Sequence, residues 1–243
     1  MTRRISERPI PRRALIMGAT GRLGVAVARA LAHRGGNVVL TARDEKKLEE
    51  LASTLETETG RRPTIVPKNL LDDDAPAHIA AEVVKQGPLD DVVLACGPFP
   101  RTPIEALARA DLELTLRVHA IAPLLLVNEL ASELAKREGA VVALTDSGVQ
   151  RPYHNHVAYL TAKGALQTGL RALAVELAPR VRLNMVSLGI VADPEADADP
   201  LRTHRMASRS PLGRFGTPEE VVHTVLALLD ATWATGEIWG IGR

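Results

Sequence analysis

Short apolar runs alternate along the chain with longer segments in which apolar residues recur every three or four positions. The short runs are rich in Val, Leu and Ile and are continuous rather than alternating, which is typical of parallel strands covered on both faces. This succession of strands and helices predicts a single α/β domain built on a doubly wound parallel sheet. We expect about seven strands, at 14–17, 37–41, 64–66, 91–95, 140–144, 181–186 and 237–239.

The longer segments have the 3.6-residue periodicity of amphipathic helices and lie at 21–33, 44–55, 111–136, 156–177 and 217–229. Polar residues at their starts support two of them. Asp44 is expected to cap the second helix. Thr217 and Glu220, with Pro218 between them, form a capping-box pattern at the start of the last one. The Pro- and Asp-rich segment 192–204 predicts a mobile loop over a site rather than a domain boundary.

Composition and charge limit the classes of protein to consider. The formal net charge is +1, which gives no general reason to expect nucleic acid or an anionic membrane surface as a partner. No apolar run approaches the ~20 residues that cross a bilayer, and no signal peptide is visible. The single cysteine, Cys96, excludes an intrachain disulfide, and we expect it to be a buried, inert thiol in a protein of the reducing cytoplasm.

The first dozen residues form a separate basic segment, in which Pro9 and Pro11 interrupt any amphipathic helix. We expect residues 1–12 to be a disordered or extended, solvated tail and residues 13–243 to be the domain. A transit peptide or a phosphate-seeking arm is the alternative. The basic residues of this cluster are Arg3, Arg4, Arg8, Arg12 and Arg13.

A glycine-rich turn follows the first predicted strand and leads into the first predicted helix. Gly18, Gly21 and Gly24 allow a tight turn and a close approach of the backbone to a ligand, and a helix N-terminus favours the pyrophosphate of a dinucleotide. The spacing therefore favours a Rossmann-like cofactor site, although glycine-rich turns also arise for purely conformational reasons. Arg22 lies inside this turn, where its guanidinium can help to clamp the phosphates of the adenosine half.

The end of the second predicted strand indicates which dinucleotide is bound. Cofactors with a free ribose hydroxyl usually meet an acidic residue there, whereas this chain has Thr41, Ala42 and Arg43. Asp44 is better explained as a helix cap. Arg43 favours a 2′-phosphate, hence NADP over NAD, with Arg22 as a second guanidinium from the adjacent loop. A solvated arginine on a turn is the alternative.

Tyr159 and Lys163 lie four residues apart, on one face of the predicted helix 156–177. A phenol is a poor proton donor and acceptor at neutral pH unless a nearby cation stabilises the phenolate, and an ammonium group one helical turn away would do so. Tyr159 is therefore a candidate acid for carbonyl or imine reduction and a candidate base for alcohol oxidation. The alternative is a half-buried tyrosine and a snorkelling lysine on an ordinary amphipathic helix.

These motifs, together with TARD (41–44), KGAL (163–166), ELAPRVRLNMV (176–186) and PLGRFGTPEEV (211–221), resemble those of the short-chain dehydrogenase/reductase family. The resemblance runs from about residue 13 to the end of the chain. In that family the tyrosine protonates the substrate, and the lysine also binds the nicotinamide ribose. A serine about thirteen residues before the tyrosine holds the substrate oxygen, and a helix asparagine supports a water relay. The resemblance also implies a homodimer or homotetramer formed through helices 111–136 and 156–177.

Several positions depart together from the common form of the family, and the combination resembles the pteridine reductases and the related dihydromonapterin and dihydrofolate reductases. In those enzymes an aspartate and the tyrosine deliver the proton while NADPH reduces a C=N bond of the pterin. The resemblance implies that Phe99 sandwiches the pterin against the nicotinamide; a packing role for Phe99 is the alternative. The departures are Arg22 for a loop glycine, LACG (94–97) for NNAG, His119 for the relay asparagine, Asp146 for the serine and Leu188 for a proline.

The residue that faces the substrate oxygen stays open between two neighbours. An anionic Asp146 suits the polar N–H groups of a pterin better than the developing alkoxide of a ketone, but a shift of one residue would restore Ser147 to the ordinary serine role. His119 is equally consistent with a relay member and with a core histidine. His154 and His156 precede the tyrosine without a matching ligand cluster, so we expect them to lie on the surface or in a substrate loop and to form no metal site.

We therefore expect an NADPH-dependent reductase of a pterin-like C=N substrate or a related carbonyl. One alternative is an ordinary carbonyl or 3-oxoacyl reductase that uses Ser147 and Tyr159. Another is a non-catalytic NADP-binding sensor, which would need neither Tyr159 nor Lys163. The residues implied to contact the cofactor are Gly18, Thr20, Gly21, Arg22, Leu23, Gly24, Arg43, Asn69, Leu70, Cys96, Gly97, Lys163, Gly189 and Val191.

Overall fold

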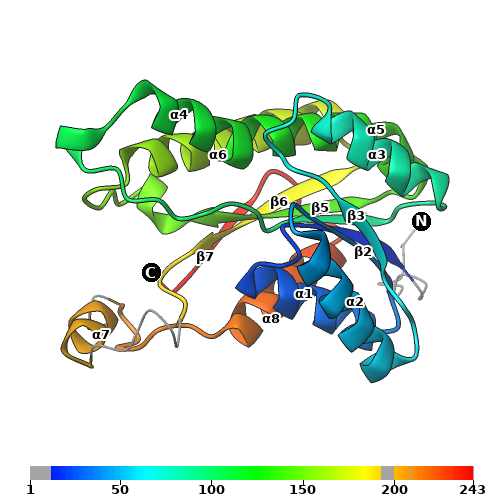
Figure 1. Ribbon diagram of the computed structural model, residues 1–243, viewed down its shortest axis with the longest axis horizontal. Coiled ribbons are helices and arrows are strands. Elements are labelled where there is room, and N and C mark those ends of the chain that lie inside the picture. Colours follow the sequence, from blue (N-terminus) through cyan, green and yellow to red (C-terminus); the bar gives the residue numbers. More distant parts are fainter. Residues whose placement is uncertain (1–11, 193–199, 209, 243) are drawn as a thin grey trace.

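The computed structural model describes residues 12–192, 200–208 and 210–242. Within these ranges the chain forms one parallel sheet of seven strands in the order β3-β2-β1-β4-β5-β6-β7 (Figure 1). The predicted fold class and the seven predicted strands are confirmed. The strands are β1 (Arg13–Met17), β2 (Asn37–Ala42), β3 (Thr64–Pro67), β4 (Asp91–Leu94), β5 (Ala140–Asp146), β6 (Arg182–Leu188) and β7 (Ile238–Ile241).

Helices cover both faces of the sheet (Figure 1). One layer consists of α3 (Ala75–Lys85), α4 (Arg109–Leu116), α5 (Ala122–Lys136) and α6 (Val157–Leu177). The opposite layer consists of α1 (Arg22–His33), α2 (Glu45–Thr59) and α8 (Pro218–Asp230). Helix α7 (Pro200–Ala207) lies apart from both layers. Three shorter segments are the 3₁₀ turns η1 (Ile104–Ala106) and η3 (Ser147–Val149) and the π-helical turn η2 (Arg117–Ile121).

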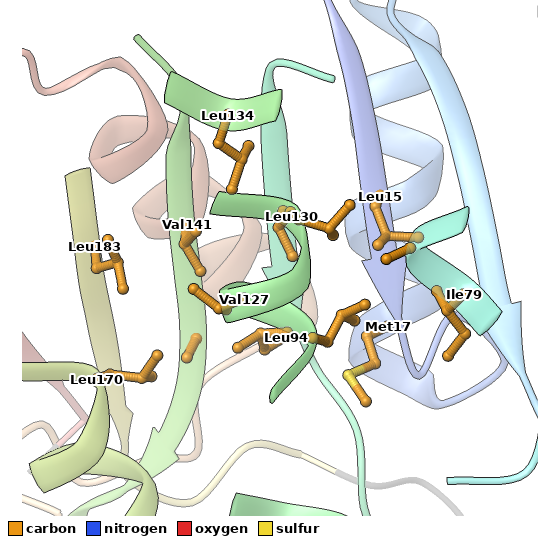
Figure 2. Packing of buried hydrophobic residues seen from close by; sticks show 14 of the residues in the cluster. Leu15, Met17, Ile79, Leu94, Val127, Leu130, Leu134, Val141, Leu170 and Leu183 are labelled. Carbon is orange, nitrogen blue, oxygen red and sulfur yellow. The ribbon is translucent and has the colours of Figure 1, made fainter. Parts of the chain in front are cut away.

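The sheet separates two hydrophobic cores, because successive side chains of a strand point to opposite faces. On β1, Leu15 and Met17 pack toward α3, α5 and α6, whereas Ala14 and Ile16 pack toward α1, α2 and α8. Figure 2 shows the first core, in which leucines of α5 lie over the sheet. Both cores consist almost entirely of aliphatic side chains. Full burial of one Leu or Ile side chain contributes about 1.5–3 kcal/mol to the free energy of unfolding.

Four of the five predicted helices are found, although α2 continues to Thr59, beyond the predicted end at residue 55, and the fifth prediction fails. The segment predicted as one helix over 111–136 consists of α4 and α5 joined by the π-helical turn η2. The spacing of apolar residues did not predict α3, a short helix that directly follows the aspartate-rich stretch 72–74. The loop predicted over 192–204 is wrong for 200–204, which belong to α7, because no Gly or Pro occurs between residues 201 and 207. Residues 193–199 lie outside the described part.

Both predicted helix caps are confirmed. The Asp44 carboxylate accepts a hydrogen bond from the backbone N–H of Lys47 at 3.1 Å. The hydroxyl of Thr217 accepts from the N–H of Glu220 at 3.4 Å, and the Glu220 carboxylate accepts from the N–H of Thr217 at 2.9 Å. The Arg214 guanidinium and this backbone contact lower the pKa of Glu220 to about 2.

The expectation of a solvated basic tail over residues 1–12 is wrong for Arg12, and Arg13 is the first residue of β1. Arg12 forms ion pairs with Asp91 and Asp230. Arg13 is buried at the start of β1: its N–H donates to Asp90 at 2.9 Å, and its guanidinium donates to two backbone carbonyls at the end of α3. These carboxylates at the amino edge of the sheet draw the chain into the fold from residue 12 onward. Residues 1–11, with Arg3, Arg4 and Arg8, lie outside the described part.

Large apolar side chains that face outward are found on several elements. Trp233, between α8 and β7, is fully exposed, and Trp239 on the edge strand β7 is 41% exposed. On the layer of α4 to α6 the exposed apolar residues include Leu114, Ile121, Leu125 and Val157. No helix in the described ranges is both long and apolar enough to cross a bilayer.

Candidate active site

The carboxyl ends of four neighbouring strands bring the predicted site residues together at one edge of the sheet. Gly18 follows β1, Cys96 and Gly97 follow β4, Asp146 ends β5, and Gly189 follows β6. Because β1 and β4 are adjacent and the chain order reverses between them, this edge holds the topological switch point. Doubly wound sheets bind their ligands at this position.

The glycine loop is shaped for close backbone packing. Gly18 has φ +84°, which favours glycine, and a side chain there would lie 2.6 Å from the Cα of Cys96. A side chain at Gly24 would collide with the carbonyl oxygen of Gly18. Gly21 is the N-cap of α1 and supplies no side-chain cap, and the first turn holds no acidic residue. The N-terminus of α1 therefore fits the pyrophosphate of a dinucleotide.

Arg22 connects the glycine loop with the segment that follows β6. Its Nη2 donates to the carbonyl oxygen of Val191 at 3.3 Å, while the residue as a whole is exposed. Gly189 packs against the end of the chain, since a side chain there would collide with Gly242. The structure thus places Val191, which follows β6, in contact with Arg22 of the predicted phosphate loop.

The residues predicted for the adenosine end follow β2 and β3. Arg43 is exposed directly after β2, and the carboxylate of its neighbour Asp44 is used as the cap of α2. Asn69 is exposed after β3, where its side-chain oxygen accepts from the N–H of Leu71 at 3.2 Å. The remaining predicted contacts, Thr20, Leu23 and Leu70, are half-buried.

Tyr159 and Lys163 lie one turn apart on α6, and both side chains are buried. The Tyr159 hydroxyl donates to the carboxylate of Asp146 at 3.1 Å. The Lys163 ammonium donates to the carbonyl oxygen of Leu144 at 3.0 Å and lies 5.7 Å from the centre of the Tyr159 ring. The predicted pair therefore exists, and strand β5 supplies the partner of each member.

The electrostatic effect expected from Lys163 is absent from this arrangement. Burial and the adjacent Asp146 carboxylate raise the pKa of Tyr159 above its ordinary value, instead of the ammonium lowering it. Burial lowers the pKa of Lys163, offset in part by Cys96 and Asp146. The reason is geometric: the carboxylate touches the hydroxyl, whereas the ammonium is bonded to a backbone carbonyl. Tyr159 is held protonated, which is the form that a proton donor needs.

Asp146, and not Ser147, accepts the Tyr159 hydroxyl. Its second carboxylate oxygen accepts from the N–H of Gly148 at 2.7 Å, which fixes the side chain at the end of β5. Ser147 begins the turn η3, where its carbonyl oxygen accepts from two later N–H groups. Tyr153, which sequence reasoning did not select, also lies near this carboxylate, and burial together with Asp146 raises its pKa.

His119 lies in the π-helical turn η2 and its ring contacts that of Tyr159. The centres of the His119 and Tyr159 rings are 5.2 Å apart, edge to face. Its Nε2 donates to the carbonyl oxygen of Pro98 at 2.9 Å, whereas its buried Nδ1 has no hydrogen-bond partner in the described structure. Burial and Lys163 lower the pKa of His119 to about 3, so the ring is neutral. Gly97 has φ +114°, and a side chain there would collide with this ring.

Phe99 reaches the site from the loop after β4, and its contact with a substrate stays a prediction. Its ring lies 4.8 Å from that of Tyr159, edge to face, and stacks on His156 at 4.1 Å. Sequence reasoning placed both His154 and His156 on the surface or in a substrate loop; His154 is exposed, but His156 is buried. Within the described ranges no group of three metal-ligating side chains occurs.

Cys96 behaves as predicted for an inert thiol. It is buried, its Sγ lies 3.6 Å from the carbonyl oxygen of Val118, and burial raises its pKa. A raised pKa keeps the sulfur in the unreactive thiol form. Its contact with the cofactor stays a prediction.

Comparisons with known proteins agree with this geometry. The family model described as enoyl-(acyl carrier protein) reductase matches residues 18–241. L-xylulose reductase of Bos taurus is 32% identical to this chain over 224 residues, which cover 90% of this chain and 88% of that protein. The chain thus shares sequence, and not only architecture, with oxidoreductases over almost its full length.

Solved structures match the fold closely. L-sorbose reductase from Gluconobacter frateurii, complexed with NADPH and L-sorbose, superimposes with a TM-score of 0.88 at 23% identity, over 95% of this chain and 94% of that one. NAD⁺-bound xylitol dehydrogenase also reaches 0.88, at 22% identity, over 96% of this chain and 98% of that one. At these identities the likeness establishes the fold alone.

Proposed function

Since the chain belongs to the short-chain dehydrogenase/reductase family, we propose that it is an NADP-dependent oxidoreductase that interconverts a carbonyl compound and its alcohol, with Tyr159 as the proton donor in reduction. One observation carries the proposal. The buried hydroxyl of Tyr159, one turn from Lys163, is held protonated at the sheet edge beside a glycine loop suited to a dinucleotide.

The cofactor would supply the hydride, and the chain would supply its binding site and the proton. The glycine loop and the N-terminus of α1 would hold the pyrophosphate. Arg43 supports NADP over NAD, because it is exposed directly after β2 and the nearest carboxylate, Asp44, is used as a cap. The Arg22 guanidinium, predicted as a second contact, is bonded instead to Val191 after β6. Lys163 would bind the nicotinamide ribose, as the family resemblance implies.

In reduction the substrate oxygen would replace the Asp146 carboxylate as the acceptor of the Tyr159 hydroxyl. As negative charge develops on that oxygen, the proton moves to it from Tyr159, and the resulting phenolate lies one turn from the Lys163 ammonium. Asp146 orients the hydroxyl before the reaction. It occupies the position that the carbonyl-reductase hypothesis gave to Ser147.

A second candidate is reduction of a pterin-like C=N bond. The observation that favours it is the carboxyl group at the proton donor, because a carboxyl can accept from the ring N–H groups of a pterin as well as exchange a proton with Tyr159. The similarity to sugar reductases favours the carbonyl substrate instead. A substrate panel with NADPH separates the two: dihydrobiopterin and dihydrofolate on one side, and small ketones, ketoses and a 3-oxoacyl thioester on the other.

Tyr159→Phe tests whether the chain is an enzyme at all. Removing the proton donor is expected to lower kcat by about 10²–10⁴-fold while NADPH binding, followed by its fluorescence, stays unchanged. Tyr153→Phe makes the same deletion at the other tyrosine, which has no lysine one turn on, and should retain most of the rate. If the wild type binds NADPH but reduces no compound in the panel, the hypothesis of a non-catalytic NADP-binding sensor is favoured instead.

We also propose a homodimer or homotetramer in the reducing cytoplasm. The exposed apolar residues Leu114, Ile121, Leu125 and Val157 support an interface on the layer of α4 to α6, where the family resemblance implied one. Sedimentation of the wild type beside Leu125→Glu tests the interface. A wild type that sediments as a monomer would contradict it.

A further inference from the structure

A cavity of about 200 Å³ lies at the amino edge of the sheet, where β1, β2 and β3 begin (Figure 1). The candidate active site lies at the opposite edge, and the two have no residue in common. At about 30 Å³ for each molecule of liquid water, the cavity has room for several waters or for one tetrahedral oxyanion. Three arginines line it, and none of the described residues that line it is an aspartate or a glutamate: the arginines are Arg13, Arg61 and Arg62.

Arg13 brings a buried positive charge to this cavity. The residue is 9% exposed, and its Nη1 donates to the carbonyl oxygens of Val83 and Gly87, both at 2.9 Å. Nη2 of the same guanidinium is buried and has no hydrogen-bond partner in the described part of the chain. The Asp90 carboxylate is bonded to the backbone N–H of Arg13 and to Arg137, and it does not line the cavity. Because a buried charged donor without an acceptor costs free energy, an acceptor that reaches Nη2 from the cavity would stabilise the fold.

Arg61 adds a second positive charge from the turn between α2 and β3. It is exposed, and its guanidinium donates to a backbone carbonyl oxygen after α1 at 2.5 Å. The ion pairs between described residues include neither Arg61 nor Arg13, whereas Arg62 is paired with two glutamates of α2. The charge of Arg62 is therefore balanced, and the excess positive charge at the cavity is that of Arg13 and Arg61.

The C-terminal ends of α1, α2 and α3 also lie at this edge, and they oppose an anion. Each helix end carries a partial negative charge of about half an elementary charge. Three such ends sum to less than the two full charges of Arg13 and Arg61. In addition, the carbonyl oxygens at the ends of α1 and α3 already accept hydrogen bonds from these two arginines. The electrostatic balance at the cavity therefore favours an anion.

We propose that this cavity is a binding site for the phosphate group of a small anion, with Nη2 of Arg13 and the guanidinium of Arg61 as the donors. Guanidinium groups bind tetrahedral oxyanions through several N–H donors at once, which a spherical anion such as chloride cannot match. The inference does not depend on the proposed function, because the cavity lies at the other edge of the sheet and its test needs neither cofactor nor turnover.

Isothermal titration calorimetry of the full chain with inorganic phosphate, against sodium chloride of equal ionic strength, tests the site. The wild type is expected to bind phosphate with a Kd below about 10 mM, and Arg61→Gln to raise this Kd about tenfold or more, because a charged hydrogen bond is lost. Two control variants remove the same charge elsewhere and should stay within about twofold of the wild type. Arg34→Gln alters the C-cap of α1 outside the cavity, and Arg43→Gln alters the predicted nucleotide site.

Two further measurements make the test independent of the variants. Far-UV circular dichroism shows whether Arg61→Gln is folded, and the side-chain Nε–Hε resonances of Arg13 and Arg61 in the wild type should shift as phosphate is added. Glycerol phosphate in place of inorganic phosphate distinguishes the source of the group, since a lower Kd for the ester would identify a phosphate monoester as the ligand.

Three results would overturn the proposal. The first is a wild type that binds phosphate no better than chloride. The second is binding that is lost in Arg43→Gln and kept in Arg61→Gln, because the phosphate would then lie at the predicted nucleotide site. The third is an equal weakening in the variants of Arg34, Arg43 and Arg61, which would be an effect of net charge alone.

Discussion

His119 makes the stability of this protein depend on pH in a way that a single substitution can remove. The ring is 1% exposed, and burial and Lys163 lower its pKa from 6.5 to about 3. A group whose pKa is depressed in the folded state stays neutral there while it binds a proton in the unfolded chain. The stability that it contributes is therefore present above the unfolded pKa and is lost as the pH falls through 6.5 toward 3.

The size of the effect follows from the two pKa values. Protonation of the unfolded chain alone lowers the free energy of unfolding by about 1.4 kcal/mol at about pH 5.5 and by about 2.7 kcal/mol at about pH 4.5. In His119→Asn this share of the acid destabilisation disappears. The baseline stability also falls, because Asn is smaller, so the difference between pH values and not the absolute stability is the quantity to compare.

Urea unfolding followed by far-UV circular dichroism at about pH 7.5, 5.5 and 4.5 measures it. His223→Asn is the matched control, because His223 is exposed on α8, and it should follow the wild type at all three pH values. If His119→Asn loses as much stability between pH 7.5 and 4.5 as the wild type does, the argument from burial is refuted.

Two further substitutions test the cofactor preference and the helix caps. Arg43→Ala should weaken NADPH binding by at least about tenfold while leaving NADH binding nearly unchanged, since a charge-assisted contact is worth about 1.5–3 kcal/mol; fluorescence titration with both dinucleotides measures this, and an unchanged ratio of affinities would contradict the 2′-phosphate assignment. Thr217→Ala should lower the free energy of unfolding by about 1 kcal/mol, because the N–H of Glu220 loses its acceptor. Thr217→Ser keeps the hydroxyl and should lower the free energy of unfolding by only a few tenths of a kcal/mol. Equal losses of stability in the two variants would show that the cap is not the cause.

The architecture could be predicted because its signals are local. Continuous apolar runs predict buried parallel strands, and polar residues such as Asp44 and Thr217 predict helix starts by their own hydrogen bonds. The glycine loop and the Tyr159–Lys163 pair are also local patterns, so the edge of the sheet that carries the site could be placed. The π-helical turn at 117–121 could not, because its apolar spacing resembles that of an ordinary helix across the insertion.

The details of the site depend on contacts between residues distant in sequence. The hydrogen bond between Asp146 and Tyr159 joins residues 13 positions apart, and that between His156 and Pro100 joins residues 56 positions apart. The periodicity of apolar residues contains no information about such contacts. The direction of the pKa shift of Tyr159 could not be predicted either, because it depends on which charged group contacts the hydroxyl. Tyr153 and the buried state of His156 were missed for the same reason.

The outward position of Trp233 and Trp239 has a practical consequence for optical work on this protein. Indole emission reports the polarity around the ring. The fully exposed ring of Trp233 is already in water, so its emission should be red-shifted and change little when the chain unfolds, and a change on denaturation should come mainly from Trp239, which is 41% exposed. The same property makes the two rings sensitive to association at the β7 edge. A shift of the emission to shorter wavelength with rising protein concentration would signal contact there while the cores remained unchanged.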